Sequence, residues 1–204
     1  MNIAIPLLSY LAGCVCTGYY LVRLCTGKDI RALGSGSVGA KNAGRILGKW
    51  AFVVTMAGDA LKGAVVVWLA RCFNGDARLE LLAGAGAIIG HVWPVQLRFQ
   101  GGKGLSTVLG ALLVFDIIGA MAYGVLAAIA CAALRNVVLG GLLAVAVMPA
   151  VFIVRGSDAF IIVGAAVVVT LILFAHRKNI AAELAVLRGR CQHRDTKKPD
   201  CDDE

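Results

Sequence analysis

Three short polar segments interrupt a chain that is otherwise apolar, and each combines a cation with glycines, hydroxyls or an amide. They are residues 34–45, 101–104 and 176–179. Backbone N–H groups in glycine-rich turns and at helix N-termini bind anions, and arginine can clamp two phosphate oxygens at once. Each segment adjoins a hydrophobic stretch. The three segments therefore predict a site that holds phosphate where the apolar spans end.

The first segment has the composition of an anion-binding nest. Four glycines and two serines lie between residues 34 and 44. Glycine tolerates positive φ and lets a ligand approach the backbone closely. A flexible loop between two helices stays the alternative, whereas a nucleotide P-loop is excluded because no Ser or Thr follows the lysine at the required spacing. The candidate phosphate-binding residues here are Ser35, Gly36, Gly39, Asn42 and Arg45.

The second segment packs three glycines around one lysine, directly before an apolar run. This arrangement predicts a helix N-terminus that presents N–H groups and an ammonium to an anion. A plain turn with a lysine reaching toward the membrane interface is the alternative. The candidate residues are Gly101, Gly102, Lys103 and Gly104.

The third segment ends the last apolar span. His176 and Asn179 are three residues apart, so they share one face if the helix continues. A histidine there can bond a hydroxyl or relay a proton. The alternative is a solvated helix end on which Arg177 and Lys178 anchor the chain to lipid headgroups.

Two ionisable residues lie inside the second apolar span. Asp59 and Lys62 are one helical turn apart and can pair. Ionisable groups at membrane depth indicate a functional site by default, and a structural ion pair facing the bundle is the alternative. Asp116 is expected in a loop without a chemical role, and His91 as a packing histidine near the end of the third span.

The composition predicts an all-α integral membrane helix bundle. Hydrophobic residues make up 59% of the 204 residues, and about 20 apolar residues cross a bilayer. The run 105–134 has 30 residues, which is about 45 Å of helix and too long for one span, so we expect it to break near Asp116 and Gly119. The seven expected spans are 3–24, 50–70, 80–97, the two halves of 105–134, 137–154 and 160–175.

The basic residues set the expected orientation. The net charge is +8, and cations cluster after the first, third and last spans. Basic loops stay in the cytoplasm, which places the N-terminus outside, and all three polar segments and the C-terminus inside. Residues 1–180 would then form one membrane domain. Residues 181–204 would form a charged cytoplasmic tail, partly disordered.

Several classes of protein do not fit these residues. No aromatic platform accompanies the charge, so we expect no nucleic acid partner. The seven cysteines show no C-x-x-C pair, and the three histidines have no metal-ligand spacing, so no disulfide framework and no metal are expected. The absence of a G-x-S-x-G elbow leaves serine hydrolase chemistry without support.

Taken together, these motifs resemble the small bacterial integral-membrane glycerol-3-phosphate acyltransferases that use acyl phosphate, often called the PlsY family. The resemblance covers residues 1–180. It is carried by residues 34–45, by the Asp59-x-x-Lys62-Gly63 pair, by Gly90-His91 with Pro94 before 99–104, and by 176–180. Each motif is weak alone, but their order and spacing make the match specific.

The resemblance implies a fold of seven helices and a reaction without metal or coenzyme A. A fatty acyl group would move from acyl phosphate to the 1-hydroxyl of glycerol 3-phosphate, giving lysophosphatidic acid and phosphate. Catalysis would rest on His176, Asn179, Ser35 and Lys103. Either His176 or the phosphate of the substrate would take the hydroxyl proton. The enzyme would work as a monomer in the bacterial cytoplasmic membrane.

The chain departs from the family pattern in the first segment and in the tail. The family usually has an asparagine at the position of Ser37, a threonine at that of Lys41 and a bulky apolar residue at that of Gly44. Residues 190–192 also lack the glutamate that is usual in the tail. Two other functions therefore stay open. One is a relative that acylates a different phosphorylated or polar acceptor, and the other is a non-enzymatic membrane protein.

Overall fold

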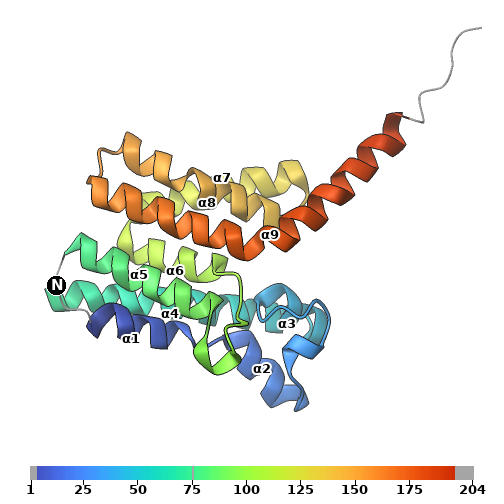
Figure 1. The fold of residues 1–204 in the computed structure, drawn as a ribbon, viewed down its shortest axis with the longest axis horizontal. Coiled ribbons are helices and arrows are strands. Elements are labelled where there is room, and N and C mark those ends of the chain that lie inside the picture. The colour runs from blue at the N-terminus through green and yellow to red at the C-terminus, as the bar shows by residue number, and fades with distance from the viewer. Residues whose placement is uncertain (1–3, 75, 196–204) are drawn as a thin grey trace, which may run out of the picture.

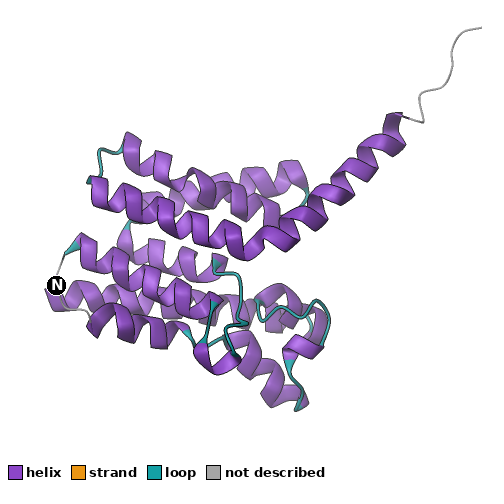
Figure 2. Ribbon diagram, viewed as in Figure 1, coloured by secondary structure: helices purple, strands orange, loops and turns teal. Residues whose placement is uncertain are grey.

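The protein is an all-helical bundle, described by a computed structural model over residues 4–74 and 76–195. Those residues contain no strand (Figure 2). The helices are α1 (Ala4–Gly13), α2 (Thr17–Thr26), α3 (Ala40–Leu47), α4 (Lys49–Asn74), α5 (Ala77–Val92), α6 (Leu105–Phe115), α7 (Ile117–Leu134), α8 (Val137–Val154) and α9 (Ala159–Asp195), with short 3₁₀ turns at Ile30–Ala32 and Val95–Leu97.

Five helical stretches of the described chain are long and apolar enough to cross a membrane. They are Ala4–Thr26, Lys49–Phe73, Ile117–Leu134, Val137–Val154 and Ala159–Arg177. Large apolar side chains such as Leu24, Phe73 and Val154 point outward and are at least 75% exposed. Such exposed apolar surface suits a lipid environment rather than water. The helices α5 and α6, at 16 and 11 residues, are shorter than a usual span.

The long apolar run 105–134 breaks at Asp116, which confirms the predicted division. Asp116 ends α6 in an extended conformation, and its side chain accepts a hydrogen bond from the Ile118 N–H at the start of α7. The first expected span, 3–24, consists of two helices, because the chain breaks between Gly13 and Thr17. A contact with α4 at this break is described below.

The helices form two layers that meet along α5 and α9 (Figure 1). One layer holds α1, α4, α5 and α6, and the other holds α7, α8 and α9. Glycines bring α4 and α6 into close contact: a Cβ added at Gly110 would lie 1.8 Å from the Ala60 oxygen, and one added at Gly63 would lie 2.3 Å from the Thr107 oxygen. Small residues of this kind are typical of helix interfaces in membranes.

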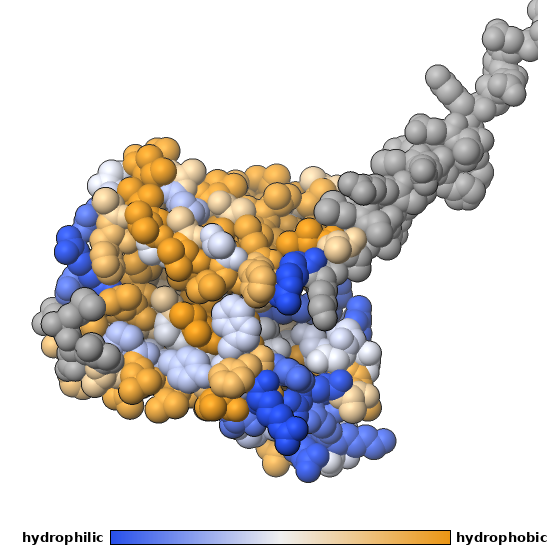
Figure 3. Space-filling model, in the orientation of Figure 1, coloured by the Kyte–Doolittle hydropathy of each residue, from blue (hydrophilic) through white to orange (hydrophobic). Residues whose placement is uncertain are grey.

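Ion pairs connect the helix joints at one end of the bundle. Arg71 pairs with Glu80 at 2.7 Å, Arg78 with Asp158 at 2.6 Å, and Arg155 with Asp116. These pairs join α4 to α5, α5 to the start of α9, and the end of α8 to the joint between α6 and α7. Asp116 therefore has the structural partner that the sequence did not reveal. The opposite end carries the polar segments, and an apolar belt lies between the two ends (Figure 3).

Candidate active site

The buried side chain of Asn42 holds the glycine-rich loop in shape through hydrogen bonds. It is 1% exposed, its Oδ1 accepts the Ser35 N–H at 2.9 Å, and its amide donates to the carbonyls of Leu33 and Ser37 at 3.0 and 2.9 Å. Because these bonds occupy both ends of the amide, Asn42 shapes the loop rather than facing a ligand. Gly36 has a φ of +71° in this turn, and Ser35 is exposed on its outer side.

The second half of the first segment is a helix, not the loop that its glycine content suggested. Gly39 precedes α3 in an extended conformation, and Lys41 and Arg45 follow on α3 four residues apart. That spacing places both cations on one face of the helix. Both side chains are exposed. Gly44 lies on α3 against α4, where an added Cβ would be 2.8 Å from the Cβ of Phe52, so this departure from the family pattern allows the two helices to pack closely.

The second polar segment folds back onto the end of α5. The N–H of Gly101 donates to the Val92 carbonyl at 3.1 Å, and the N–H of Gly102 donates to the His91 carbonyl at 2.9 Å. The last carbonyls of a helix have no partner within the helix, and this loop supplies partners for two of them. Gly104, with a φ of +84°, is the N-cap of α6. Lys103 therefore stands directly before a helix N-terminus, as its sequence predicts.

His176 brings the third polar segment against the second. Its side chain is 1% exposed, and its Nε2 lies 3.3 Å from the carbonyl oxygen of Lys103. A carbonyl only accepts, so Nε2 carries the proton in this contact. Nδ1 then keeps its lone pair, and it has no partner among the described residues. The side chain of Asn179 lies outside the described part of the structure.

Three cations gather around this site without a counterion in the described chain. Burial lowers the pKa of Lys103 below its ordinary value, and the nearby charges of Lys41 and Arg45 lower it further. The described residues give none of the three an ion pair. Uncompensated positive charge binds phosphate, whereas the N–H groups of Ser35, Gly36, Gly101 and Gly102 already donate to acceptors within the protein.

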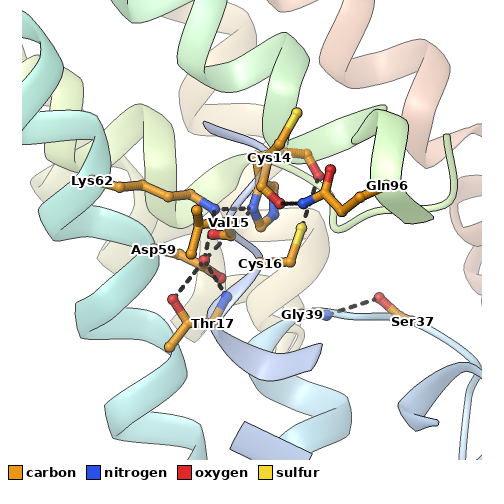
Figure 4. A network of polar contacts seen from close by, with 10 residues as sticks. Cys14, Val15, Cys16, Thr17, Ser37, Gly39, Asp59, Lys62 and Gln96 are labelled. Atoms are coloured by element: carbon orange, nitrogen blue, oxygen red, sulfur yellow. Dashed lines mark hydrogen bonds and ion pairs between the residues drawn. The ribbon is translucent and has the colours of Figure 1, made fainter. Parts of the chain in front are cut away.

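Asp59 and Lys62 form the ion pair that their spacing allows, and they lie inside a larger buried network (Figure 4). The ammonium of Lys62 contacts Asp59 Oδ1 at 2.9 Å, the Val15 carbonyl at 2.7 Å and His91 Nδ1 at 2.7 Å. Thr17 donates to Asp59 Oδ1 from both its N–H and its hydroxyl. The Val15 carbonyl belongs to the break between α1 and α2, so the network stabilises that break.

The sequence did not reveal that His91 belongs to this network. Its partners are 29 and 32 residues earlier, on another helix. A histidine one turn from the end of an apolar span is as common in packing as in ion binding, so no local signal distinguished the two. Only the pairing of α4 with α5 brings His91 to Lys62.

Known proteins place this arrangement in a family. The family model described as glycerol-3-phosphate acyltransferase matches residues 3–185. The chain is 42% identical over 172 residues to glycerol-3-phosphate acyltransferase 1 of Desulfitobacterium hafniense (strain Y51), covering 84% of this chain and 85% of that protein. It is 40% identical over 178 residues to glycerol-3-phosphate acyltransferase of Syntrophotalea carbinolica, covering 85% and 89%.

Solved structures agree with these relatives. The crystal structure of PlsY (YgiH), an integral membrane glycerol 3-phosphate acyltransferase, matches in its glycerol 3-phosphate form with a TM-score of 0.84 and 31% identity over 92% of both chains. The lysophosphatidic acid form matches with a TM-score of 0.80 and 29% identity. Sequence, fold and relatives lead to one conclusion: the chain belongs to the glycerol-3-phosphate acyltransferase family.

Proposed function

We propose that this protein moves a fatty acyl group from acyl phosphate to the 1-hydroxyl of glycerol 3-phosphate. The products are lysophosphatidic acid and inorganic phosphate. Membership of the family makes the protein a membrane acyltransferase that acts on glycerol 3-phosphate. The acyl phosphate donor, the catalytic residues and the face of the membrane at which they act are the parts that we propose.

One observation carries the proposal. Lys41, Arg45 and Lys103 gather at a site that has no counterion in the described residues, next to two glycine loops. Both proposed substrates carry a phosphate, so two anions have cations to neutralise them. Acyl phosphate has a good leaving group, and positioning with charge stabilisation can supply most of the catalysis.

The proposed roles follow from where each residue lies. The exposed Ser35 side chain holds one phosphate together with Arg45, and Gly36 and Gly39 shape the loop that leads to α3. Gly101, Gly102 and Gly104 shape the turn from which Lys103 reaches the second phosphate. Asn42 acts through the shape of the first loop.

His176 is the protein group best placed to take the hydroxyl proton. Its Nε2 contacts the Lys103 carbonyl, so the buried Nδ1, which has no partner among the described residues, keeps the lone pair that a base needs. The phosphate of the substrate is the other candidate. Asn179 stays a proposed orienting partner of His176, three residues along the same helix.

The proposed membrane placement has seven crossings, counting α1 and α2 as one and adding the shorter α5 and α6. The excess of Lys and Arg near α2, α3 and α9 favours the cytoplasm for that end of the bundle. The N-terminus is then outside, and the active site opens to the cytoplasm of a bacterium at its inner membrane. One copy of the chain supplies every residue named above, which supports action as a monomer.

The acyl chain has apolar surroundings within reach of the site. The described helices form an open apolar pocket lined by residues of α4, α5, α6, α8 and α9, including Ile88, Val108 and Val169. Ile88 also lies beside Gly104. A fatty chain attached to a phosphate held at Lys103 can therefore remain in apolar contact.

Phosphate release from palmitoyl phosphate by the purified protein tests the proposal. We expect release that depends on glycerol 3-phosphate and yields lysophosphatidic acid, and no transfer from palmitoyl-CoA. Lys103→Ala and Arg45→Ala should each abolish most of the transfer, while Arg23→Ala, an exposed cation on α2 without a place in the site, should not. Full activity in both site variants would contradict the phosphate-binding roles. Activity only with another phosphorylated alcohol would instead favour an altered acceptor. The residue that motivates this alternative is Lys41, which lies where the family pattern has a threonine.

A further inference from the structure

His91 connects the buried ion network to the glycine loop that carries Lys103. Its side chain is 3% exposed at the end of α5. One side of the imidazole contacts Lys62, and the other side lies against Gly102. His91 therefore contacts both the buried ion network and the loop that carries Lys103.

The network holds the imidazole in one orientation. The Lys62 ammonium has three N–H donors and three acceptors around it: the Val15 carbonyl, Asp59 and His91 Nδ1. A lysine ammonium cannot accept, so His91 Nδ1 is the acceptor and the ring proton is on Nε2. With every donor used, a rotation of the ring would leave a buried ammonium proton without a partner, which is costly.

Gly102 lies on the free edge of this ring. A Cβ added at Gly102 would be 2.0 Å from His91 Nε2, 2.5 Å from Cε1 and 3.0 Å from Cδ2. Its three nearest neighbours are all atoms of the imidazole. Gly101 differs, because a Cβ there would meet the His91 backbone oxygen at 2.1 Å and the ring of Pro94 at 2.5 Å. A side chain at residue 102 would therefore strike the His91 imidazole, whereas one at residue 101 would strike the His91 backbone and Pro94.

The next residue is Lys103, and it belongs to the catalytic site in two ways. Its carbonyl contacts His176 Nε2 at 3.3 Å, and its ammonium lies near the cations of α3. A displacement of Gly102 moves both groups together. A misplacement of about 1 Å can lower a reaction rate on the order of a hundredfold.

We propose that His91 is a positioning residue for acyl transfer. Held by Lys62, its imidazole supports Gly102 and thereby sets Lys103 and His176 at their places in the site. The contact itself is a property of the fold, and its effect on acyl transfer depends on the function proposed above.

A double-mutant cycle tests this role. His91→Asn keeps an acceptor for Lys62, since the amide oxygen branches where histidine carries Nδ1, but it removes the ring beneath Gly102. We expect Gly102→Ala to lower kcat on the order of a hundredfold in the wild-type background, but only about threefold or less in the His91→Asn background, because Nε2 and Cε1, the two nearest atoms that it strikes, are gone. Gly101→Ala is the matched control. Its neighbours are backbone and Pro94, so it should cost the same in both backgrounds.

The kinetic constants separate positioning from a merely structural role. We expect His91→Asn alone to lower kcat at least about tenfold with little change in the KM for glycerol 3-phosphate, because misplaced groups act on the transition state. An unchanged kcat in His91→Asn would overturn the proposal. So would an equal cost of Gly102→Ala in both backgrounds.

Thermal unfolding of the same variants in detergent gives a readout that does not need activity. We expect the shifts in unfolding midpoint caused by Gly102→Ala and His91→Asn to be non-additive in the double variant. The shifts caused by Gly101→Ala and His91→Asn should be additive. If the wild type transferred no acyl group, the proposed function would fail while this cycle still tested the contact. Additive midpoints for the Gly102 pair would overturn it.

A spectroscopic measurement covers the case in which His91→Asn does not fold. In ¹⁵N-histidine-labelled protein, the His91 signal should show a proton on Nε2 and an unprotonated Nδ1. That signal should move in Gly102→Ala far more than in Gly101→Ala. A His91 signal that Gly102→Ala leaves in place would overturn the proposal.

Discussion

Replacing Lys62 by methionine should destabilise the protein by about 3–5 kcal/mol, which is the cost of breaking a buried ion pair by removing one partner. The Asp59 side chain is 3% exposed, so solvent cannot replace the lost ammonium. Methionine fills similar space but leaves Asp59 Oδ1 with only the two donors of Thr17. It also leaves the Val15 carbonyl and His91 Nδ1 without the 2.7 Å contacts that the ammonium makes with each.

Reversible unfolding in mixed micelles, followed by tryptophan fluorescence, measures this cost. Lys49→Met is the matched control, because Lys49 is an exposed lysine at the start of the same helix, and it should change stability by less than about 0.5 kcal/mol. The double variant Asp59→Asn with Lys62→Met should lose less than Lys62→Met alone, since no unpaired charge remains buried. A cost below about 1 kcal/mol for Lys62→Met, or a double variant at least as unstable as Lys62→Met alone, would refute the reasoning.

Three further predictions concern the proposed phosphate site. Asn42→Ala should lower the free energy of unfolding by about 2–4 kcal/mol, because it leaves several buried loop groups unpaired, and it should also lower kcat. Unfolding measures the first effect and initial rates measure the second. Full stability of the variant would contradict the role of Asn42 in shaping the loop. The pKa of Lys103 is lowered by burial and by neighbouring cations, so kcat/KM should fall as pH rises through that lowered value; Lys41→Gln removes one of those cations and should move the fall to higher pH, while a shift to lower pH would contradict it. Gly44→Leu should cost about 1–3 kcal/mol, because α3 must move away from Phe52; unfolding of the variant measures this, and combination with Phe52→Ala should recover part of the loss.

The sequence predicted the parts of the fold that follow from the lengths of the apolar runs. The bounds of α8 agree with the expected span 137–154 at both ends. The break at Asp116 follows from a run too long for one crossing and from an aspartate that can cap the next helix. These features depend on local sequence alone, which is why they could be predicted.

Features that depend on contacts between distant residues could not be predicted. The break in the first span has no proline, and its Val15 carbonyl is satisfied by a lysine 47 residues later. The glycines of the first segment indicated a loop and not the helix α3, and one of them, Gly44, lies against Phe52 on α4. Likewise, Asn42 looked like a phosphate ligand, and only the folded loop shows its amide turned inward.

The buried ion network and the proposed phosphate site belong to one structural solution. A membrane bundle needs each backbone polar group satisfied internally, and regular helices do this without help. A phosphate site instead needs irregular backbone whose N–H groups face a ligand, and such backbone leaves carbonyls exposed at the ends of α1 and α5. Lys62 satisfies the Val15 carbonyl, and the glycine loop satisfies those of His91 and Val92. Asp59 neutralises Lys62. His91 contacts both Lys62 and Gly102, and so connects the ion network to the glycine loop. The costly charges therefore lie where the break between α1 and α2 comes close to the glycine loop of the proposed site.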